Sequence, residues 1–201
     1  GAADAMRRIA LGSLARGIKG RDQRRVKLLD VACGNGHFLR QVMGAFPRMV
    51  ATGLDLSPAY CAEARERLAD WRQIEIVQGA IEQAPFEDAS FDAATCVYLF
   101  HELPPRVRRE AAREIARLLK PGGVFVIIDH SAIAGSHEDQ AQPLHRIDQA
   151  VVRQEVESVG FAYDGEAQML RNPSDLRTTS VFVPSIRGHT DQFVMRFRKP
   201  S

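Results

Sequence analysis

Cysteine is scarce in this 201-residue sequence, and the three that occur form no pattern. Cys33, Cys61 and Cys96 stand far apart and lie in apolar or helix-like stretches. A disulfide framework would need an even number at regular spacings, and a zinc site would need closer ones. We therefore expect reduced, buried cysteines in an intracellular, cytoplasmic protein.

Long hydrophobic runs and a strong charge excess are also missing. No apolar stretch approaches the roughly 20 residues that a membrane-spanning helix needs, so we expect no membrane span. Lysine and arginine total 27 against 25 aspartate and glutamate, and a net charge of +2 is too small to indicate a nucleic-acid partner. Basic residues do gather in residues 1–25, which we interpret as a solvated N-terminal segment before a single domain over residues 26–201.

What the sequence does contain is an alternation of strand-like and helix-like segments. Five short, mostly apolar runs are typical of strands buried in a parallel sheet: residues 26–33, 49–56, 74–79, 91–100 and 124–130. Helical spacing is found over residues 37–46, after Ser57 and after Pro104. This order predicts an α/β fold, with a doubly wound, mostly parallel sheet and right-handed crossovers.

The last third of the chain has a different pattern. Apolar residues at helical spacing over residues 144–159 predict one helix. Residues 167–171 and 192–199 are strand-like, with no helix pattern between them. We expect these two strands to form an antiparallel pair at one edge of the sheet.

Ligands of open α/β sheets bind beyond the carboxyl ends of the strands. There, "LLDVACGNG" places Gly34 and Gly36 after the first strand, where glycines allow positive φ and let backbone N–H groups approach a ligand. Asp55 ends the second strand, where a carboxylate can accept hydrogen bonds from ribose hydroxyls. Together these residues predict an adenosine-containing cofactor.

A dinucleotide or a nucleoside triphosphate fits this loop poorly. The third glycine of a G-x-G-x-x-G fingerprint is replaced by the bulky Leu39, and the sequence has no G-K-S/T of a Walker loop. We therefore expect a cofactor that is not held through phosphate.

Four successive segments resemble the motifs of class I S-adenosylmethionine-dependent methyltransferases: "LLDVACGNG", "GLDLS", "GAIEQAPFEDASFD" and "RLLKPGGVFVIID". They span residues 26–130 in the family's order and are similar to the ubiquinone and menaquinone biosynthesis type. The C-terminal third resembles a group of bacterial predicted methyltransferases. The resemblance implies a Rossmann-like, seven-stranded sheet with an antiparallel final strand. It also implies S-adenosyl-L-methionine as cofactor and S-adenosyl-L-homocysteine as product.

The resemblance further implies roles for residues of the predicted site. Those expected around the methionine part are Asp30, Cys33, Gly34, Asn35, Gly36 and Cys96, and those around the ribose and adenine are Asp55, Leu56, Ala80 and Ile81. Ala80 departs from the family pattern, which has an acid there for the adenine amino group. Main-chain groups, Gln78 or Glu82 are the alternatives for that contact.

Methyl transfer to a hydroxyl, an amine or an acidic carbon also needs a base. "VYLFHELP" offers Tyr98, His101 and Glu102 at the end of the fourth strand, and His130 ends the fifth. An ordinary imidazole pKa of about 6.5 favours His101, although a histidine before a helix equally often bonds only to backbone. The run "HED" at 137–139 contains metal-ligand types, but consecutive residues do not converge on one point, and we expect no metal site.

The sequence predicts methyl transfer from S-adenosylmethionine to a small-molecule acceptor. A non-catalytic S-adenosylmethionine-binding module or partner subunit is the alternative, and an NAD-dependent oxidoreductase fits less well because of Leu39. Arg171, Arg177 and His145 could favour an anionic or oxygenated acceptor, or could pair with nearby aspartates instead. The segment before the first strand is short for a lid, and a homodimer would supply that cover.

Overall fold

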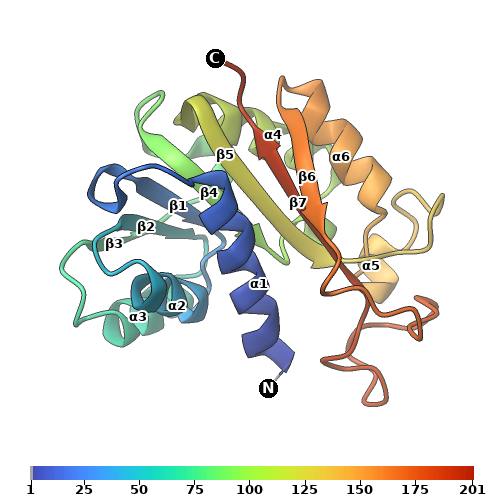
Figure 1. The fold of residues 1–201 in the computed structure, drawn as a ribbon. Helices are drawn as coiled ribbons and strands as arrows, with labels where there is room; N and C mark the ends of the chain where they lie inside the picture. The colour runs from blue at the N-terminus through green and yellow to red at the C-terminus, as the bar shows by residue number, and fades with distance from the viewer. Residues whose placement is uncertain (1) are drawn as a thin grey trace.

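The computed structural model describes the backbone of residues 2–201 and the side chains of residues 8–201. A seven-stranded sheet crosses the molecule, with helices on both faces (Figure 1). The strands are β1 (Lys27–Val31), β2 (Val50–Asp55), β3 (Ile74–Gln78), β4 (Phe91–Val97), β5 (Leu119–His130), β6 (Ala162–Ala167) and β7 (Gln192–Arg198). The helices are α1 (Ala2–Gly17), α2 (His37–Ala45), α3 (Pro58–Arg67), α4 (Pro105–Leu118), α5 (Ala141–Leu144) and α6 (Gln149–Ser158). Short 3₁₀ turns are η1 (Gln23–Arg25), η2 (Ile81–Gln83) and η3 (Phe100–Glu102).

The strand order confirms the predicted fold class. It is β3-β2-β1-β4-β5-β7-β6, and β7 runs antiparallel to both of its neighbours while the other pairs are parallel. The chain order reverses between β1 and β4, because β2 and β3 lie on one side of β1 while β4 and β5 lie on the other. The loops that follow β1 and β4 therefore diverge, which opens the carboxyl edge of the sheet at this point.

Side chains of the strands alternate between two cores, one on each face of the sheet. Leu28 of β1 packs with residues of α1, α2 and α3, whereas Leu29 and Val31 pack with residues of α4 and α6. This is the two-residue period of a strand with both faces covered. It explains why these strands appear in the sequence as nearly continuous apolar runs.

The N-terminal segment differs from the solvated arm expected over residues 1–25. It forms α1, whose Ala10 and Leu14 are buried against α2, β5 and β7, and Ile18, directly after the helix, is buried as well. Arg8 and Arg16 do face solvent, and the side chain of Arg7 lies outside the described residues. Arg8 and Arg16 thus lie on the exposed face of an amphipathic helix that covers the sheet.

The prediction of a strand at residues 167–171 is wrong, because β6 lies earlier, at Ala162–Ala167. Met169, which gave that stretch its apolar character, is 76% exposed in a turn. β6 is the outer strand of the sheet and pairs with β7 alone, with a register shift between Tyr163 and Glu166. An outer strand with a polar, irregular sequence carries little of the apolar signal that identifies inner strands.

The helix expected over residues 144–159 is interrupted. His145 takes a left-handed φ of 53° directly after α5, and α6 begins only at Gln149. Between the two helices, Ile147 forms an isolated parallel bridge with Ser131, which follows β5. This contact with a distant strand end overrides the helical spacing and holds His145 at the carboxyl edge of the sheet.

Candidate functional site

The loop between β1 and α2 follows a left-handed path. Ala32, Gly34 and Gly36 have φ angles of 55°, 54° and 79°. A Cβ at Gly36 would lie 2.8 Å from Leu68 Cδ1, whereas the space beside Gly34 is open. Glycine is therefore needed at Gly36 by its backbone and by the packing of α3, and Gly34 leaves room for a ligand.

Asp55, at the end of β2, holds this loop in place. Its Oδ2 accepts a hydrogen bond from Gly34 N (2.8 Å), and its Oδ1 accepts one from Ser57 N (2.9 Å). A carboxylate has about four acceptor positions, so the two oxygens of Asp55 can receive about two further donors. Asp55 is 8% exposed and lines the β2–β3 cavity, so a ligand in that cavity can supply these donors.

Asp30 lies deeper, at the end of β1. Its Oδ1 accepts a hydrogen bond from the Thr95 hydroxyl on β4 (2.7 Å), and the residue is 2% exposed. Burial, together with the negative charge of Asp55, raises the pKa of Asp30 to about 7, and the Thr95 hydrogen bond only partly opposes this. A cation placed beside Asp30 would favour its ionised form.

Two cavities adjoin at Ala32 on this edge of the sheet. The first, about 400 Å³ and here called the loop cavity, is lined by the predicted residues Asp30, Cys33, Gly34, Asn35 and Tyr98, and also by Ala32, His37, Phe38, Tyr60 and Val97. The second, about 110 Å³ and here called the β2–β3 cavity, is lined by the predicted Asp55, Leu56, Ala80 and Ile81, and also by Val31, Ala32, Leu54, Gly79, Glu82, Leu99 and Leu103. The structure thus brings most of the residues predicted to bind a cofactor to two neighbouring cavities that share Ala32.

Cys96 lines neither cavity, contrary to the expectation for it. Its side chain is fully buried in the core beneath α4, together with Val31 and Phe100. The next residue along β4, Val97, lines the loop cavity instead, because consecutive side chains of a strand point to opposite faces. The three cysteines are free and buried, as expected.

The β2–β3 cavity has an apolar mouth. Leu56 is 69% exposed, an unusually large exposure for a leucine beside a cavity, while Ile81 is buried. Glu82 lines the cavity, and the side chain of Gln78 donates to the carbonyl of Leu56 (3.4 Å). Of the two side chains considered in place of an acid at Ala80, only Glu82 therefore faces the space that a ligand would fill.

Tyr98 and His130 form a stacked pair at the end of β4 and β5. Their rings lie 4.3 Å apart and within 5° of parallel, and Tyr98 has a strained, left-handed φ of 58°. The Tyr98 hydroxyl donates to Gln192 Oε1 (2.8 Å), and His130 Nδ1 lies 2.8 Å from the Thr190 hydroxyl. Burial lowers the pKa of His130 to about 4, despite the charge of Asp129, so that its ring is neutral at neutral pH.

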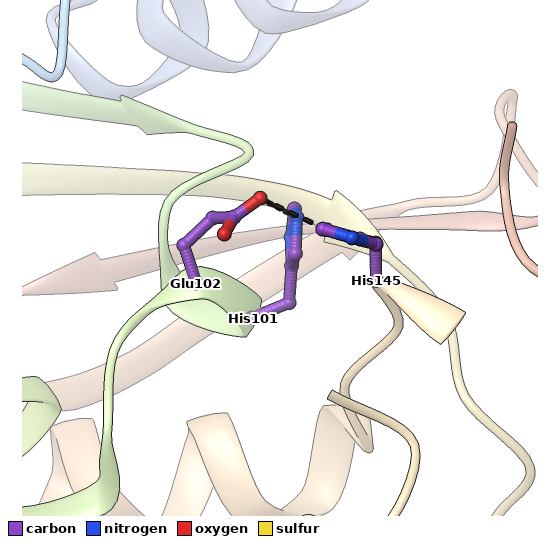
Figure 2. Close-up of side chains that lie close together, drawn as sticks. All are labelled: His101, Glu102 and His145. Carbon is purple, nitrogen blue, oxygen red and sulfur yellow. Dashed lines mark hydrogen bonds and ion pairs between the residues drawn. The ribbon is translucent and has the colours of Figure 1, made fainter. Parts of the chain in front are cut away.

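His101 lies between two carboxylates. Its Nδ1 donates to Asp129 Oδ1 (2.6 Å), and its Nε2 faces Glu102 Oε1 at 3.1 Å. Burial disfavours the charged ring, but Asp129 and Glu102 outweigh it and raise the pKa of His101 above its ordinary value. His145 Nδ1 reaches the same Glu102 oxygen at 2.9 Å, so the three side chains converge on one point (Figure 2).

The arginines considered for an anionic acceptor are paired within the protein. Arg171 Nη1 and Arg177 Nε each lie 3.1 Å from Asp191 Oδ2. Asp191 is fully buried, so this network tethers the loop before β7 to the body of the domain. His145, the third residue of that group, is the one that faces the carboxyl edge.

The arrangement of fold and site defines a class of protein. A mostly parallel sheet with an antiparallel β7, a left-handed glycine loop after β1 and an acid at the end of β2 together form the class I methyltransferase architecture. Residues 28–123 match the family model described as "Methyltransferase domain". Over these residues, slightly less than half of the chain, the sequence is therefore similar to a methyltransferase domain.

Individual known proteins are similar to this chain in part of the sequence or in the fold. A demethylmenaquinone methyltransferase from Staphylococcus aureus is 34% identical over 108 residues, which are 52% of this chain and 43% of that protein. The chain thus matches less than half the length of the curated relatives. A candidate sarcosine dimethylglycine methyltransferase from Galdieria sulphuraria has the same fold, with a TM-score of 0.79 and 21% identity over 98% of this chain and 86% of that one. The N-methyltransferase NodS from Bradyrhizobium japonicum, in complex with S-adenosylhomocysteine, superposes with a TM-score of 0.72 and 17% identity over 97% and 87% of the two chains.

Sequence reasoning missed several residues of the site. His37, Phe38 and Tyr60 line the loop cavity from the first turns of α2 and α3. Their positions directly after the glycine loop and after the Ser57 cap are a signal that could have identified them. The approach of His145 to Glu102 has no such signal, because it depends on the break between α5 and α6.

Proposed function

We propose that the protein transfers a methyl group from S-adenosylmethionine to a small-molecule acceptor. The observation that carries the proposal is the contact of Asp55 Oδ2 with Gly34 N, which joins the glycine loop to the acid at the end of β2. Through this contact the carboxylate of Asp55, which lines the β2–β3 cavity, lies beside the backbone of Gly34, which lines the loop cavity and has open space next to it. These are the two groups that the proposal needs to bind a cofactor across both cavities.

The cofactor occupies the two cavities in a defined direction. Asp55 accepts hydrogen bonds from the ribose hydroxyls, and Leu56, Ala80 and Ile81 enclose the adenine in the β2–β3 cavity, with Glu82 beside its amino group. The methionine part lies in the loop cavity. There the surrounding residues are Asp30, Cys33, Gly34 and Asn35, while Gly36 shapes the loop behind them, and the carboxylate of Asp30 favours the ammonium group. Covering the exposed Leu56 removes apolar surface from water, which stabilises the complex.

The sulfonium of the cofactor is already an activated methyl donor. The protein therefore has to align the acceptor with the S–CH3 bond and exclude water, rather than supply a nucleophile of its own. Tyr98 is suited to this alignment, because its strained backbone turns the ring toward the loop cavity while its hydroxyl is tied to Gln192.

Of the three candidate catalytic residues, His101 has the geometry to act on the acceptor. Asp129 fixes its ring and tautomer, so that Nε2 points to the half-exposed Glu102 at the edge of the site. His130 has its Nδ1 committed to Thr190 and its ring stacked on Tyr98, which supports a positioning role for both.

The alternatives from the sequence give different results in simple assays. A methyltransferase releases S-adenosylhomocysteine when it is given pools of small hydroxyl, amine and carbon acceptors, including a demethylated quinone. A non-catalytic module or partner subunit binds the cofactor but releases none, and an NAD-dependent oxidoreductase is stabilised thermally by NAD instead. A homodimer that covers the cavity would appear as a second species in light scattering.

His101→Ala should lower turnover at least tenfold while the affinity for S-adenosylhomocysteine stays within twofold of wild type, because His101 lines neither cavity. The measurement is S-adenosylhomocysteine release with the acceptor found in the screen, beside a calorimetric titration. Normal turnover of a folded His101→Ala protein would remove His101 from the mechanism.

A further inference from the structure

We infer that His101, Glu102 and His145 bind one divalent transition-metal ion, and that this ion holds an oxygen of the acceptor, so that His101 acts on the acceptor through the ion and not as a free base. The part of the inference that concerns the acceptor rests on the proposed function. The metal site itself rests on the geometry of three side chains that the fold brings together from two distant segments (Figure 2).

The three donor atoms have the spacing that a metal ion requires. One nitrogen from each histidine and one carboxylate oxygen all lie within 4.8 Å of one another, and Glu102 Oε1 is 3.1 Å from His101 Nε2 and 2.9 Å from His145 Nδ1. Two ligands at about 2.1 Å from a tetrahedral zinc ion lie about 3.4 Å apart. Small side-chain shifts therefore convert the present cluster into a coordination shell.

The donor types select the class of metal. Two imidazoles and one carboxylate suit zinc and the neighbouring first-row ions, whereas Mg²⁺ and Ca²⁺ prefer shells made of oxygen. Three protein ligands also leave at least one coordination position for a water molecule or a substrate oxygen, which is the pattern of catalytic rather than structural sites.

Asp129 orients His101 as the outer carboxylate of a metal site does. It is fully buried, and its Oδ1 accepts the Nδ1 hydrogen of His101 at 2.6 Å while its Oδ2 accepts the backbone N–H of the same residue at 3.1 Å. Because an ionised carboxylate only accepts hydrogen bonds, Nδ1 must carry the hydrogen, and Nε2 is left to face the cluster.

The cluster is open to ions from solvent. The side chains of Glu102 and His145 are 50% and 30% exposed, while His101 at 5% forms the floor. Phe182 packs edge-on against His145, with ring centres 4.8 Å apart, and restricts the movement of that ring. The left-handed turn at His145 places its side chain here, so the break between α5 and α6 has a functional reason.

The cluster lies beside the proposed methyl-transfer site. The His101 ring is 5.9 Å from the His130 ring, which stacks on Tyr98 of the loop cavity. An acceptor hydroxyl bound to the ion loses its proton to water more readily, since a bound cation lowers the pKa of an oxygen ligand. The metal-held oxygen then forms the new O–CH3 bond as the S–CH3 bond breaks, and the electron pair of that bond stays on sulfur to give S-adenosylhomocysteine. The acceptor class is therefore a small molecule with a hydroxyl or enol oxygen.

The test is a calorimetric titration of the chelator-treated, full-length protein with Zn²⁺, and separately with Mg²⁺. We expect one Zn²⁺ per chain with a dissociation constant near or below about 1 µM, and no comparable binding of Mg²⁺. His145→Ala and Glu102→Gln should each weaken Zn²⁺ binding at least tenfold. Co²⁺ should give visible absorption bands with wild type that both variants lose.

His189→Ala is the matched control, because His189 is exposed and lies outside the cluster. It should bind Zn²⁺ like wild type. Equal affinity in wild type and both cluster variants, or no Zn²⁺ binding by wild type at millimolar concentration, overturns the metal site. A parallel titration with S-adenosylhomocysteine separates the two proposals: intact cofactor binding without Zn²⁺ binding contradicts the metal site alone, and the reverse result contradicts the proposed function.

Discussion

Single residues at the carboxyl edge have two tasks, one in the fold and one toward the ligand. Asp55 fastens the glycine loop through Gly34 and caps the turn into α3 through Ser57, yet its oxygens have room for further donors. Asp30 holds Thr95 of the neighbouring strand and is kept buried beside Asp55. The free protein therefore contains two close carboxyl groups whose repulsion a cofactor with hydroxyl and ammonium groups would relieve.

Asp30 gives cofactor binding a pH dependence. Because its pKa is raised to about 7 by burial and by Asp55, it is mostly protonated at pH 6 and mostly ionised at pH 8. The ionised form attracts the ammonium group, so the affinity for S-adenosylhomocysteine should rise by up to about tenfold between these values. Calorimetry at both pH values, with wild type and Asp30→Asn, measures this. A wild-type affinity that is independent of pH contradicts the assignment, and Asp30→Asn should lose most of the rise.

The stability of the free protein should change in the opposite direction. The pKa of Asp30 is higher in the folded state than in the unfolded chain, so its contribution favours folding below pH 4 and is lost as the pH rises from about 4 to about 7. At pH 8, Asp30→Asn should therefore be at least as stable as wild type in urea.

At this scale the sequence predicts what lies within a few positions of a strand end. Gly34, Gly36 and Asp55 follow from the rule that ligands bind beyond β1 and β2. Cys96 was misplaced because motif order does not reveal which face of β4 a side chain occupies. His145 could not be placed, since nothing local indicates that the chain turns back to Glu102.

Whole elements present these residues. Gly36, the last residue of the glycine loop, is the N-cap of α2, and the end of α3 packs so closely that a side chain at Gly36 would clash with Leu68. Near the ends of β4 and β5, the break between α5 and α6 positions His145 next to Glu102 of η3. The two halves of the site thus depend on one very close helix contact and one helix break.

Gly36→Ala tests the helix contact. Its positive φ and a distance of 2.8 Å from the new Cβ to Leu68 Cδ1 should lower the free energy of unfolding by about 1–3 kcal/mol. Gly44→Ala, in the same helix with nothing within 4 Å of the added Cβ, should instead raise it by about 0.5–1 kcal/mol. Urea unfolding measures both. Equal effects of the two changes would mean that the left-handed turn is not required.

Elements with a strong apolar period were predictable, and those shaped by distant contacts were not. α2, α3 and α4 lie where their spacing and their Pro and Ser signals place them. β6 was not predicted because this outer strand is mostly polar. α1 was not predicted because its arginines are more prominent in the sequence than the apolar side that buries Leu14. In both cases the missing information is which surface the element covers.

The whole molecule concentrates its chemistry at the reversal point between β1 and β4. The two cavities and the His101 cluster lie along one edge of the sheet, and a buried ion pair between Arg108 and Glu155 ties α4 to α6. No helix among the described residues is long and apolar enough to cross a membrane. The residues of the proposed methyl-transfer site all come from one sheet and from the loops and helices beside it.

The central claim is that this edge binds the adenosyl cofactor through Asp55, and one calorimetric titration with S-adenosylhomocysteine tests it most directly. Wild type should bind one equivalent, and Asp55→Ala should bind roughly tenfold or more weakly, because charged hydrogen bonds to the ribose are lost. Asp70 is exposed and lines neither cavity, so Asp70→Ala should bind S-adenosylhomocysteine with wild-type affinity. Binding by a folded Asp55→Ala protein at wild-type affinity, or no binding by wild type, would contradict the account.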